Sequence, residues 1–224
     1  MKNGYRHELK YIISRASAEI LRRRLPHFMA RDPHAGAQGQ YTIRSLYFDD
    51  FYGSAVEEKE SGLATRTKYR LRCYNYDLSF VKLERKEKHG ALTKKKAQTL
   101  SRERALSLQA LQEDPQATGL TLELQNKLRW EGLRPRVLVD YDRTPFVCAD
   151  GNTRITLDEN LRTRPYSADL LAPATAMIPV LEPEQVILEV KFDDFLPGYL
   201  AQVIGDIPKA PMAISKFTLC MQFL

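Results

Sequence analysis

Basic residues occupy alternate positions along one segment of this chain, and this pattern constrains the fold more than any other feature. Between residues 66 and 72 the order is Arg-Thr-Lys-Tyr-Arg-Leu-Arg. Side chains along a β-strand point alternately to opposite faces, so four cations would share one face, with Thr67, Tyr69 and Leu71 on the other. A solvent-exposed sheet face would explain one such strand. Several such strands in one sheet favour another explanation.

Three further predicted strands carry interleaved charges on a single face. These faces hold Arg6, Glu8 and Lys10 in the strand 5–13, Lys82, Glu84 and Lys86 in the strand 79–87, and Glu189 and Lys191 in the strand 186–192. If the sheet closes into a barrel or tunnel with helices packed outside, these faces line its lumen. Cations crowded in a low-dielectric lumen require an anion of high charge density, and phosphate oxygens suit Arg and Lys. The glutamates among them would hold a divalent cation that bridges those oxygens.

The remaining periodicity predicts an α+β fold in one domain over residues 1–224, an antiparallel barrel or tunnel of about eight strands. The strand with residues 66–72 is expected to extend over 65–74, and further strands over 40–49, 135–142, 144–148 and 153–158, with a hairpin turn at 149–152. Helices are expected after a cap at Ser14 or Ser17 and over 50–60, 101–112, 120–131, 198–207 and 214–223.

Charge and composition narrow the class of protein. The net charge of +6 arises in one region, because residues 66–104 hold thirteen Lys or Arg against four Asp or Glu, which indicates an anionic ligand there. No apolar run approaches the ~18 residues of a membrane span. The N-terminus has no signal-peptide pattern, and Cys73, Cys148 and Cys220 show no zinc-binding or disulfide spacing. We therefore expect a cytoplasmic protein.

Eight short motifs occur in order along the chain and carry a family resemblance. They are Arg6-His7-Glu8-Leu9-Lys10-Tyr11, Ser45-Leu46-Tyr47-Phe48-Asp49, Arg70-Leu71-Arg72, Leu83-Glu84-Arg85-Lys86, Tyr141-Asp142-Arg143-Thr144-Pro145-Phe146, Arg154-Ile155-Thr156-Leu157-Asp158, Leu188-Glu189-Val190-Lys191 and Ser215-Lys216-Phe217. Together they resemble the VTC domain, the catalytic domain of the vacuolar transporter chaperone polyphosphate polymerase. That domain belongs to the triphosphate tunnel metalloenzymes, which also include CYTH-type triphosphatases and class IV adenylate cyclases.

The resemblance implies a metal-dependent polyphosphate polymerase, in which the end of a polyphosphate chain attacks the γ-phosphate of ATP inside a tunnel. The catalytic residues implied by the motifs are Lys10, Arg70, Arg72, Lys86, Arg143, Arg154, Lys191 and Lys216. The motifs and the alternating faces together predict substrate contacts at Arg6, Lys68, Lys82, Tyr141 and Ser215, and the resemblance implies further contacts at Lys94 and Lys96, at the tunnel entrance. Glu189 would hold Mn²⁺ or Mg²⁺, with Glu8 as the other candidate ligand.

The N-terminal strand departs from the pattern of the wider superfamily. Many members carry an ExExK sequence with two metal-binding glutamates, whereas here Arg6 stands at the first of these positions and leaves Glu8 and Lys10. Metal affinity or geometry is therefore expected to differ from that of the triphosphatases.

Two other functions fit the charge pattern. One is a triphosphatase of the same superfamily, in which water replaces the phosphate acceptor. The other is a module that binds polyphosphate or RNA without turnover, with tyrosines such as Tyr69 and Tyr74 available for stacking on bases. The Ser215-Lys216-Phe217 motif and the pair Tyr141 and Arg143 favour the polymerase, and RNA binding does not explain the glutamates among the cations.

Overall fold

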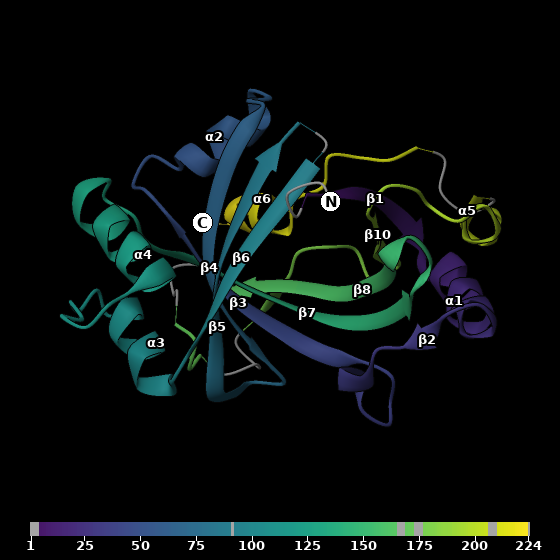
Figure 1. The fold of residues 1–224 in the computed structure, drawn as a ribbon, viewed down its shortest axis with the longest axis horizontal. Helices are drawn as coiled ribbons and strands as arrows, with labels where there is room; N and C mark the ends of the chain where they lie inside the picture. The colour runs from purple at the N-terminus through teal and green to yellow at the C-terminus, as the bar shows by residue number, and fades with distance from the viewer. Residues whose placement is uncertain (1–4, 91, 165–168, 173–176, 206–209, 224) are drawn as a thin grey trace.

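The computed structural model describes residues 5–90, 92–164, 169–172, 177–205 and 210–223, and Figure 1 shows their arrangement. The strands are β1 (Arg6–Ser14), β2 (Ala30–Arg31), β3 (Tyr41–Asp49), β4 (Thr65–Tyr74), β5 (Asp77–His89), β6 (Leu92–Leu100), β7 (Arg134–Cys148), β8 (Thr153–Arg164), β9 (Ile178–Pro179) and β10 (Gln185–Phe192). The α-helices are α1 (Arg15–Arg24), α2 (Ser54–Glu60), α3 (Arg102–Gln109), α4 (Gly119–Trp130), α5 (Gly198–Gly205) and α6 (Lys216–Met221). None of the described helices is long and apolar enough to cross a lipid bilayer.

Eight of the described strands pair into a closed ring. The order is β7-β3-β4-β5-β6-β1-β10-β8, and β8 pairs in turn with β7. All of these pairings are antiparallel, while the two-residue strands β2 and β9 extend from β7 and β8. Closure leaves no long unpaired edge and encloses a lumen. The predicted α+β tunnel is therefore confirmed, although the ring is less regular than a simple barrel.

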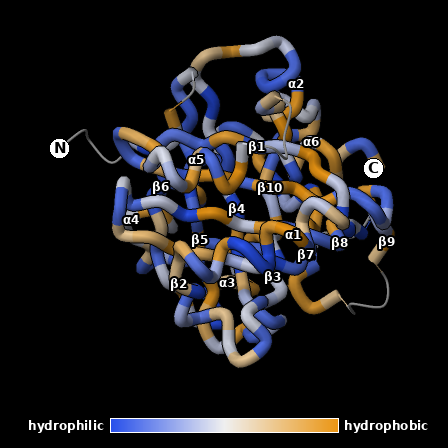
Figure 2. The backbone as a smooth tube through the Cα atoms, turned by 90° about the vertical axis from the view of Figure 1, so that its right-hand side faces the viewer, coloured by the Kyte–Doolittle hydropathy of each residue, from blue (hydrophilic) through white to orange (hydrophobic). Residues whose placement is uncertain are grey.

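The register of the ring places the charged positions of neighbouring strands side by side. Lys68 of β4 lies opposite Lys86 of β5, and Lys10 of β1 lies opposite Glu189 of β10. Directly opposed residues in an antiparallel ladder point to the same face, so the alternating charges form one continuous inner surface. Figure 2 shows the corresponding interleaving of hydrophilic and hydrophobic positions along the chain.

Two apolar clusters cover the outer face of the ring. Leu71 of β4, Leu83 of β5 and Leu124 of α4 belong to the cluster beneath α3 and α4. Leu188 of β10 and Leu21 of α1 belong to the cluster beneath α1 and α5, at the opposite end of the molecule in Figure 1. Burial of one such leucine contributes about 1.5–3 kcal/mol. These clusters therefore stabilise the ring from outside.

The C-terminal helix α6 differs from α1, α3, α4 and α5 because it packs on the inner side of the ring. Its Phe217 and Cys220 are buried with Tyr47 of β3 and with Val139 and Tyr141 of β7. Ser215 begins the helix, since its hydroxyl accepts a hydrogen bond from the Thr218 backbone N–H at 3.3 Å. The expectation that helices pack outside the ring therefore holds for α1, α3, α4 and α5 but not for α6.

Several elements differ from the sequence expectation. Strand β6 is not predicted, because the consecutive residues Lys94, Lys95 and Lys96 hide its alternation. The segments 135–142 and 144–148 form the single strand β7, which continues through Arg143. The C-terminal helix is shorter than 214–223, because it begins only after the Ser215 cap. The end of the helix expected over 198–207 lies outside the described residues.

A glycine in the turn between β7 and β8 packs closely against another part of the chain. Gly151 has φ of +60°, and a Cβ there would collide with the backbone carbonyl oxygen of Phe195. Gly151→Ala is expected to lower the free energy of unfolding by more than the ~1–2 kcal/mol of a left-handed backbone alone. Gly62→Ala is the matched control, because Gly62 has φ of +73° and open space around a would-be Cβ. Urea unfolding of both variants measures the difference, and equal losses would contradict the prediction.

Candidate functional site

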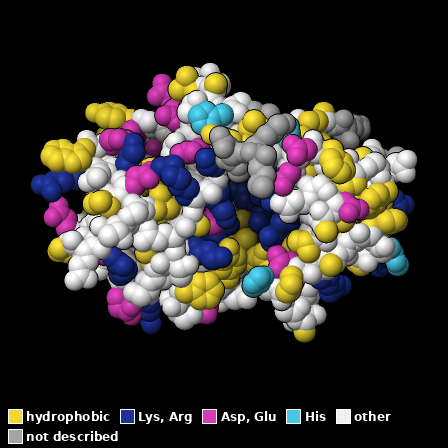
Figure 3. Space-filling view, viewed as in Figure 1, with side chains coloured by type: hydrophobic (Ala, Val, Ile, Leu, Met, Phe, Trp, Pro, Cys, Tyr) yellow, Lys and Arg dark blue, Asp and Glu magenta, His cyan; other side chains and the backbone are white. Residues whose placement is uncertain are grey.

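A cavity of about 170 Å³ occupies the lumen of the ring. Among the described residues, eleven Lys or Arg side chains line it, against the two carboxylates of Glu8 and Glu189. Figure 3 shows a hollow near the centre of the molecule with Lys and Arg side chains on its walls. The cavity is therefore strongly positive and enclosed by low-dielectric walls, which concentrates its field on an entering anion.

Most of the predicted site residues meet in this cavity. Of the predicted catalytic residues, Lys10, Arg70, Arg72, Lys86, Arg143, Lys191 and Lys216 line it. The predicted substrate contacts Lys68, Tyr141 and Ser215 and the predicted metal ligands Glu8 and Glu189 line it as well. These side chains come from five strands and the start of α6, so closure of the ring is what brings them together.

Glu84 holds the two arginines of β4. Its carboxylate accepts from Arg70 Nε at 2.7 Å, lies 3.5 Å from Arg72 Nη1 and accepts from Lys95 Nζ at 2.8 Å. The side chain of Glu84 is only 1% exposed. Burial alone would raise the pKa of Glu84, but Arg70, Arg72 and Lys95 outweigh it and hold that pKa far below its usual range. Glu84 therefore stays ionised and fixes the guanidinium planes.

Asp158 has the same role on the other side of the lumen. It accepts two hydrogen bonds from Arg143, at 2.6 and 2.7 Å, and lies 2.6 Å from Lys216 Nζ. Burial raises the pKa of Asp158, but Arg143 and Lys216 lower it below the usual value. Both cations also lie over the ring of Tyr141, at 5.2 and 4.8 Å from its centroid. One carboxylate of β8 thus fixes a cation of β7 and the first residue of α6.

Glu8 and Glu189 share a third group of cations. Lys10 Nζ lies 3.1 Å from Glu8 Oε1 and 3.4 Å from Glu189 Oε1. Lys86 Nζ donates to Glu8 at 2.7 Å, and Lys191 Nζ donates to Glu189 at 2.9 Å. Burial raises the pKa of Glu8, but Lys10 and Lys86 lower it to about 2. Burial likewise raises the pKa of Glu189, but Lys191 and Lys10 hold it well below its usual range, so both glutamates are ionised at neutral pH.

Burial lowers the pKa of two lysines of the cavity, Lys68 and Lys86. Burial lowers the pKa of Lys68 to about 7, and its ammonium lies 4.2 Å from the centroid of the Phe217 ring with no hydrogen-bond partner among the described residues. The pKa of Lys86 is also lowered to about 7, because burial and the nearby Lys10 and Lys191 outweigh Glu8. An anion placed here would favour the charged form of both lysines.

Two predicted arginines lie away from the cavity walls. Arg154 Nη2 donates to Asp32 at 2.7 Å and to the Tyr41 hydroxyl at 2.8 Å. Arg6 Nε lies 2.8 Å from Asp193 Oδ1. Each of these arginines thus has an acidic partner of its own, and a contact with substrate stays a prediction for both.

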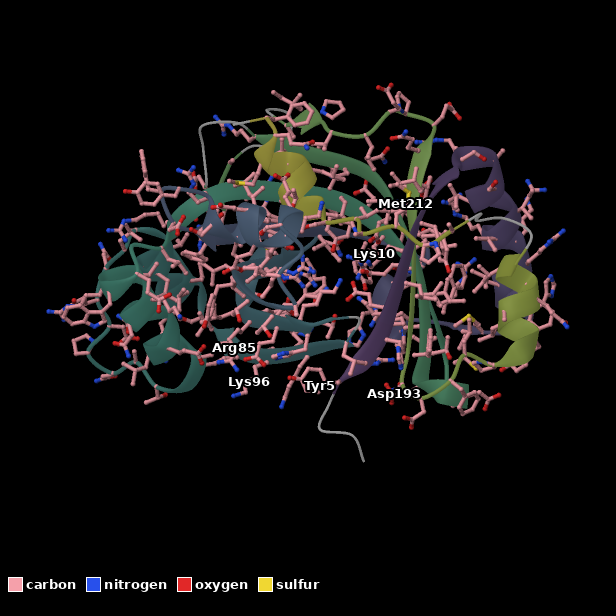
Figure 4. The ribbon with its side chains drawn as sticks, turned by 90° about the horizontal axis from the view of Figure 1, so that it is seen from above. Tyr5, Lys10, Arg85, Lys96, Asp193 and Met212 are labelled. Atoms are coloured by element: carbon pink, nitrogen blue, oxygen red, sulfur yellow. The ribbon has the colours of Figure 1, made fainter. Side chains whose placement is uncertain are left out.

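Three predicted lysines also lie elsewhere. The ammonium of Lys82 is 5.5 Å from the centroid of the Tyr74 ring, and that of Lys94 is 5.5 Å from that of Tyr5. Lys96 is exposed and lies with Tyr5 at the rim of the molecule, whereas Lys10 lies farther inside (Figure 4). Their predicted part in substrate binding is likewise untested.

The alternation of charges does not reveal every residue of the site. Glu84 and Asp158 both lie in the quoted motifs, and alternation puts Glu84 on the charged face, but only the closed ring shows which cations they contact. Lys59 and Lys88 also line the cavity. Lys88 continues the alternation of β5 beyond its predicted end, whereas Lys59 lies on α2, where strand alternation gives no signal.

Comparison with known proteins agrees with this geometry. The family model of the VTC domain matches residues 5–224, so the chain belongs to the VTC domain family. The fold is similar to that of a Vibrio parahaemolyticus protein provisionally assigned as an adenylate cyclase, with a TM-score of 0.50 and 10% identity over 95% of this chain and 97% of that one. A protein from Pyrococcus horikoshii OT3 gives a TM-score of 0.50 and 12% identity over 96% and 95% of the two chains. No curated protein sequence matches the chain.

The low pKa of Glu8 makes stability depend on pH below 4.5. The folded protein holds this carboxylate ionised down to about pH 2, whereas the ordinary pKa of a glutamate side chain is 4.5. The stabilisation, about 3 kcal/mol, is present above pH 4.5 and is lost as the pH falls toward 2. Urea unfolding between pH 5 and pH 2.5 should show a steeper loss for the wild type than for Glu8→Gln. Parallel pH profiles would show that Glu8 carries no such linkage.

Proposed function

We propose that this chain is a metal-dependent polyphosphate polymerase that transfers the γ-phosphate of ATP onto a polyphosphate chain in the cavity. The observation that carries the proposal is the excess of cations, eleven against two carboxylates among the described lining residues. A chain of phosphates carries a charge on every unit and no bulky substituent, so it matches both the charge and the narrow volume of the cavity. Membership of the VTC domain family supports this choice of substrate.

The proposed mechanism depends on alignment and charge neutralisation. Phosphoryl transfer requires little covalent chemistry from the protein, because the acceptor phosphate is itself the nucleophile. Arg70, Arg72 and Arg143 are already held by Glu84 and Asp158, so they would bind phosphate oxygens with little reorganisation. The less compensated Lys68 would reach the same chain with a mobile ammonium. Together these cations would hold the donor and acceptor phosphates in line.

Glu8 and Glu189 would hold the divalent cation. Their carboxylates contact the same ammonium, that of Lys10, so oxygens of both converge on one position. Carboxylate oxygens are ligands that Mg²⁺ and Mn²⁺ prefer. When bound, such an ion would polarise phosphate oxygens and neutralise part of their charge.

The first test is synthesis of polymer. The purified chain, incubated with ATP and Mn²⁺, should form products that stain as polyphosphate on a gel, and Glu189→Gln should reduce their rate by two orders of magnitude or more, roughly the loss typical of removing one transition-state contact. Glu87→Gln is the control, since Glu87 pairs with Arg85 and does not line the cavity. Release of orthophosphate without polymer would instead identify a triphosphatase. Unchanged turnover in Glu189→Gln would refute the role of Glu189.

The second test concerns the shape of the ligand. Tripolyphosphate should raise the melting temperature far more than orthophosphate, because one chain contacts several cations at once and binds only the folded protein. Single-stranded RNA of equal total charge should stabilise less, since its bases do not fit a cavity of about 170 Å³. A thermal-shift series at matched ionic strength compares the three ligands. Equal shifts from RNA and tripolyphosphate would indicate binding on an open basic surface.

A further inference from the structure

The ammonium of Lys10 occupies the position between Glu8 and Glu189. It lies 3.1 Å from an oxygen of Glu8 and 3.4 Å from an oxygen of Glu189. Among the described residues, no other cation contacts both glutamates. The ammonium also donates to the backbone carbonyl of Ile214 at 3.1 Å, which fixes it in place. A lysine thus already neutralises the point at which the two carboxylates converge.

The remaining carboxylate oxygens also have cationic partners. Lys86 donates to both oxygens of Glu8, at 3.0 and 2.7 Å. The second oxygen of Glu189 accepts from Lys191 at 2.9 Å and from Arg143 at 3.2 Å. The two glutamates are 7% and 5% exposed, so water screens these contacts little. A divalent cation entering the cavity alone would meet net positive charge and no free carboxylate oxygen.

The protein alone also supplies too few ligands for a metal ion. No group of three His, Cys, Asp or Glu side chains in the described part of the chain is placed to hold a metal. Mg²⁺ needs six oxygens at about 2.0–2.1 Å and is often bound by one or two carboxylates together with substrate phosphates. Phosphate oxygens would therefore complete the coordination of the metal begun by Glu8 and Glu189. They would also accept hydrogen bonds from the Lys10 ammonium when it leaves the two glutamates.

We infer that Lys10 is the resident cation of this site, so that a divalent metal binds only when a polyphosphate draws the ammonium away from Glu8 and Glu189. Binding is then ordered: the empty cavity excludes the free metal, and the metal enters with the phosphate chain or after it. The inference rests on the proposed function only for the identity of the polyanion. Exclusion of the metal from the empty cavity follows from the contacts of Glu8 and Glu189 with Lys10 and its neighbouring cations, whatever the polyanion is.

Titration of the empty protein with Mn²⁺ tests the inference directly. The six-line paramagnetic resonance signal of free Mn²⁺ is lost on binding, so it reports affinity without any nucleotide. The wild type should show no saturable binding below millimolar Mn²⁺. Lys10→Met should bind roughly tenfold more tightly or better, because it removes the one cation that both glutamates share and leaves Glu189 Oε1 without its ammonium. Lys191→Met is the matched control: it removes the same charge beside Glu189 but leaves Lys10 in place, and it should gain much less. An equal gain in both variants, or micromolar binding by the wild type, would overturn the inference.

A melting experiment provides a second readout that includes the wild type. Mn²⁺ alone should leave the melting temperature of the wild type unchanged and raise that of Lys10→Met, in which two neighbouring carboxylates lack their shared ammonium. If Lys10→Met does not fold, the wild type still decides, since a stabilising shift with Mn²⁺ alone would show that Lys10 does not exclude the metal. Failure of the polymer assay would overturn the proposed function but not these results, which contain no phosphate.

Discussion

The pairing of buried carboxylates with cations is the interaction on which the rest of this structure depends. Glu8, Glu84, Asp158 and Glu189 each contact at least two cations inside the ring. A buried ion pair contributes little net stability, because the cost of desolvation offsets most of the attraction. The carboxylates therefore make a lumen full of lysine and arginine possible, while the leucine clusters on the outer face supply the stability. Loss of the buried carboxylates or of the leucine clusters would therefore oppose closure of the ring.

Only some of the cations in the lumen have a carboxylate partner, and the two kinds of cation therefore have different properties. Arg70, Arg72 and Arg143 have buried carboxylate partners, whereas Lys59, Lys68 and Lys88 have no ion pair within the part of the chain that the structure describes. The first group is rigid and permanently charged, which suits precise alignment of an anion. The second group has long flexible side chains whose charge a neighbouring anion would increase. The three arginines are thus suited to positioning an anion, and the three lysines to adapting to it and neutralising its charge.

The sequence predicts the ring better than the site. The alternation of residues 66–72 and of three other strands is a local property, and it correctly indicates a sheet with a charged inner face. Which carboxylate holds which cation depends on register between strands that are distant in sequence, as Asp158 of β8, Arg143 of β7 and Lys216 of α6 illustrate. Arg6 follows the alternation and Arg154 lies in a quoted motif, yet both contact acidic partners away from the cavity walls, Asp193 and Asp32, which only the folded chain reveals.

The two ends of the described chain meet at the cavity, and this couples the last segment to the first strand. The Met212 N–H donates to the Lys10 carbonyl oxygen at 2.8 Å, while the Lys10 ammonium donates to the Ile214 carbonyl, and Figure 4 shows Lys10 and Met212 close to each other. Lys216, two residues farther on, is bound by Asp158. Residues 212–215 therefore form a wall of the cavity. Lys10 holds this wall at one end, and the pair of Lys216 with Asp158 holds it at the other. An anion that draws Lys10 or Lys216 away from its carboxylate would also loosen this wall, so ligand binding and closure of the cavity share the same contacts.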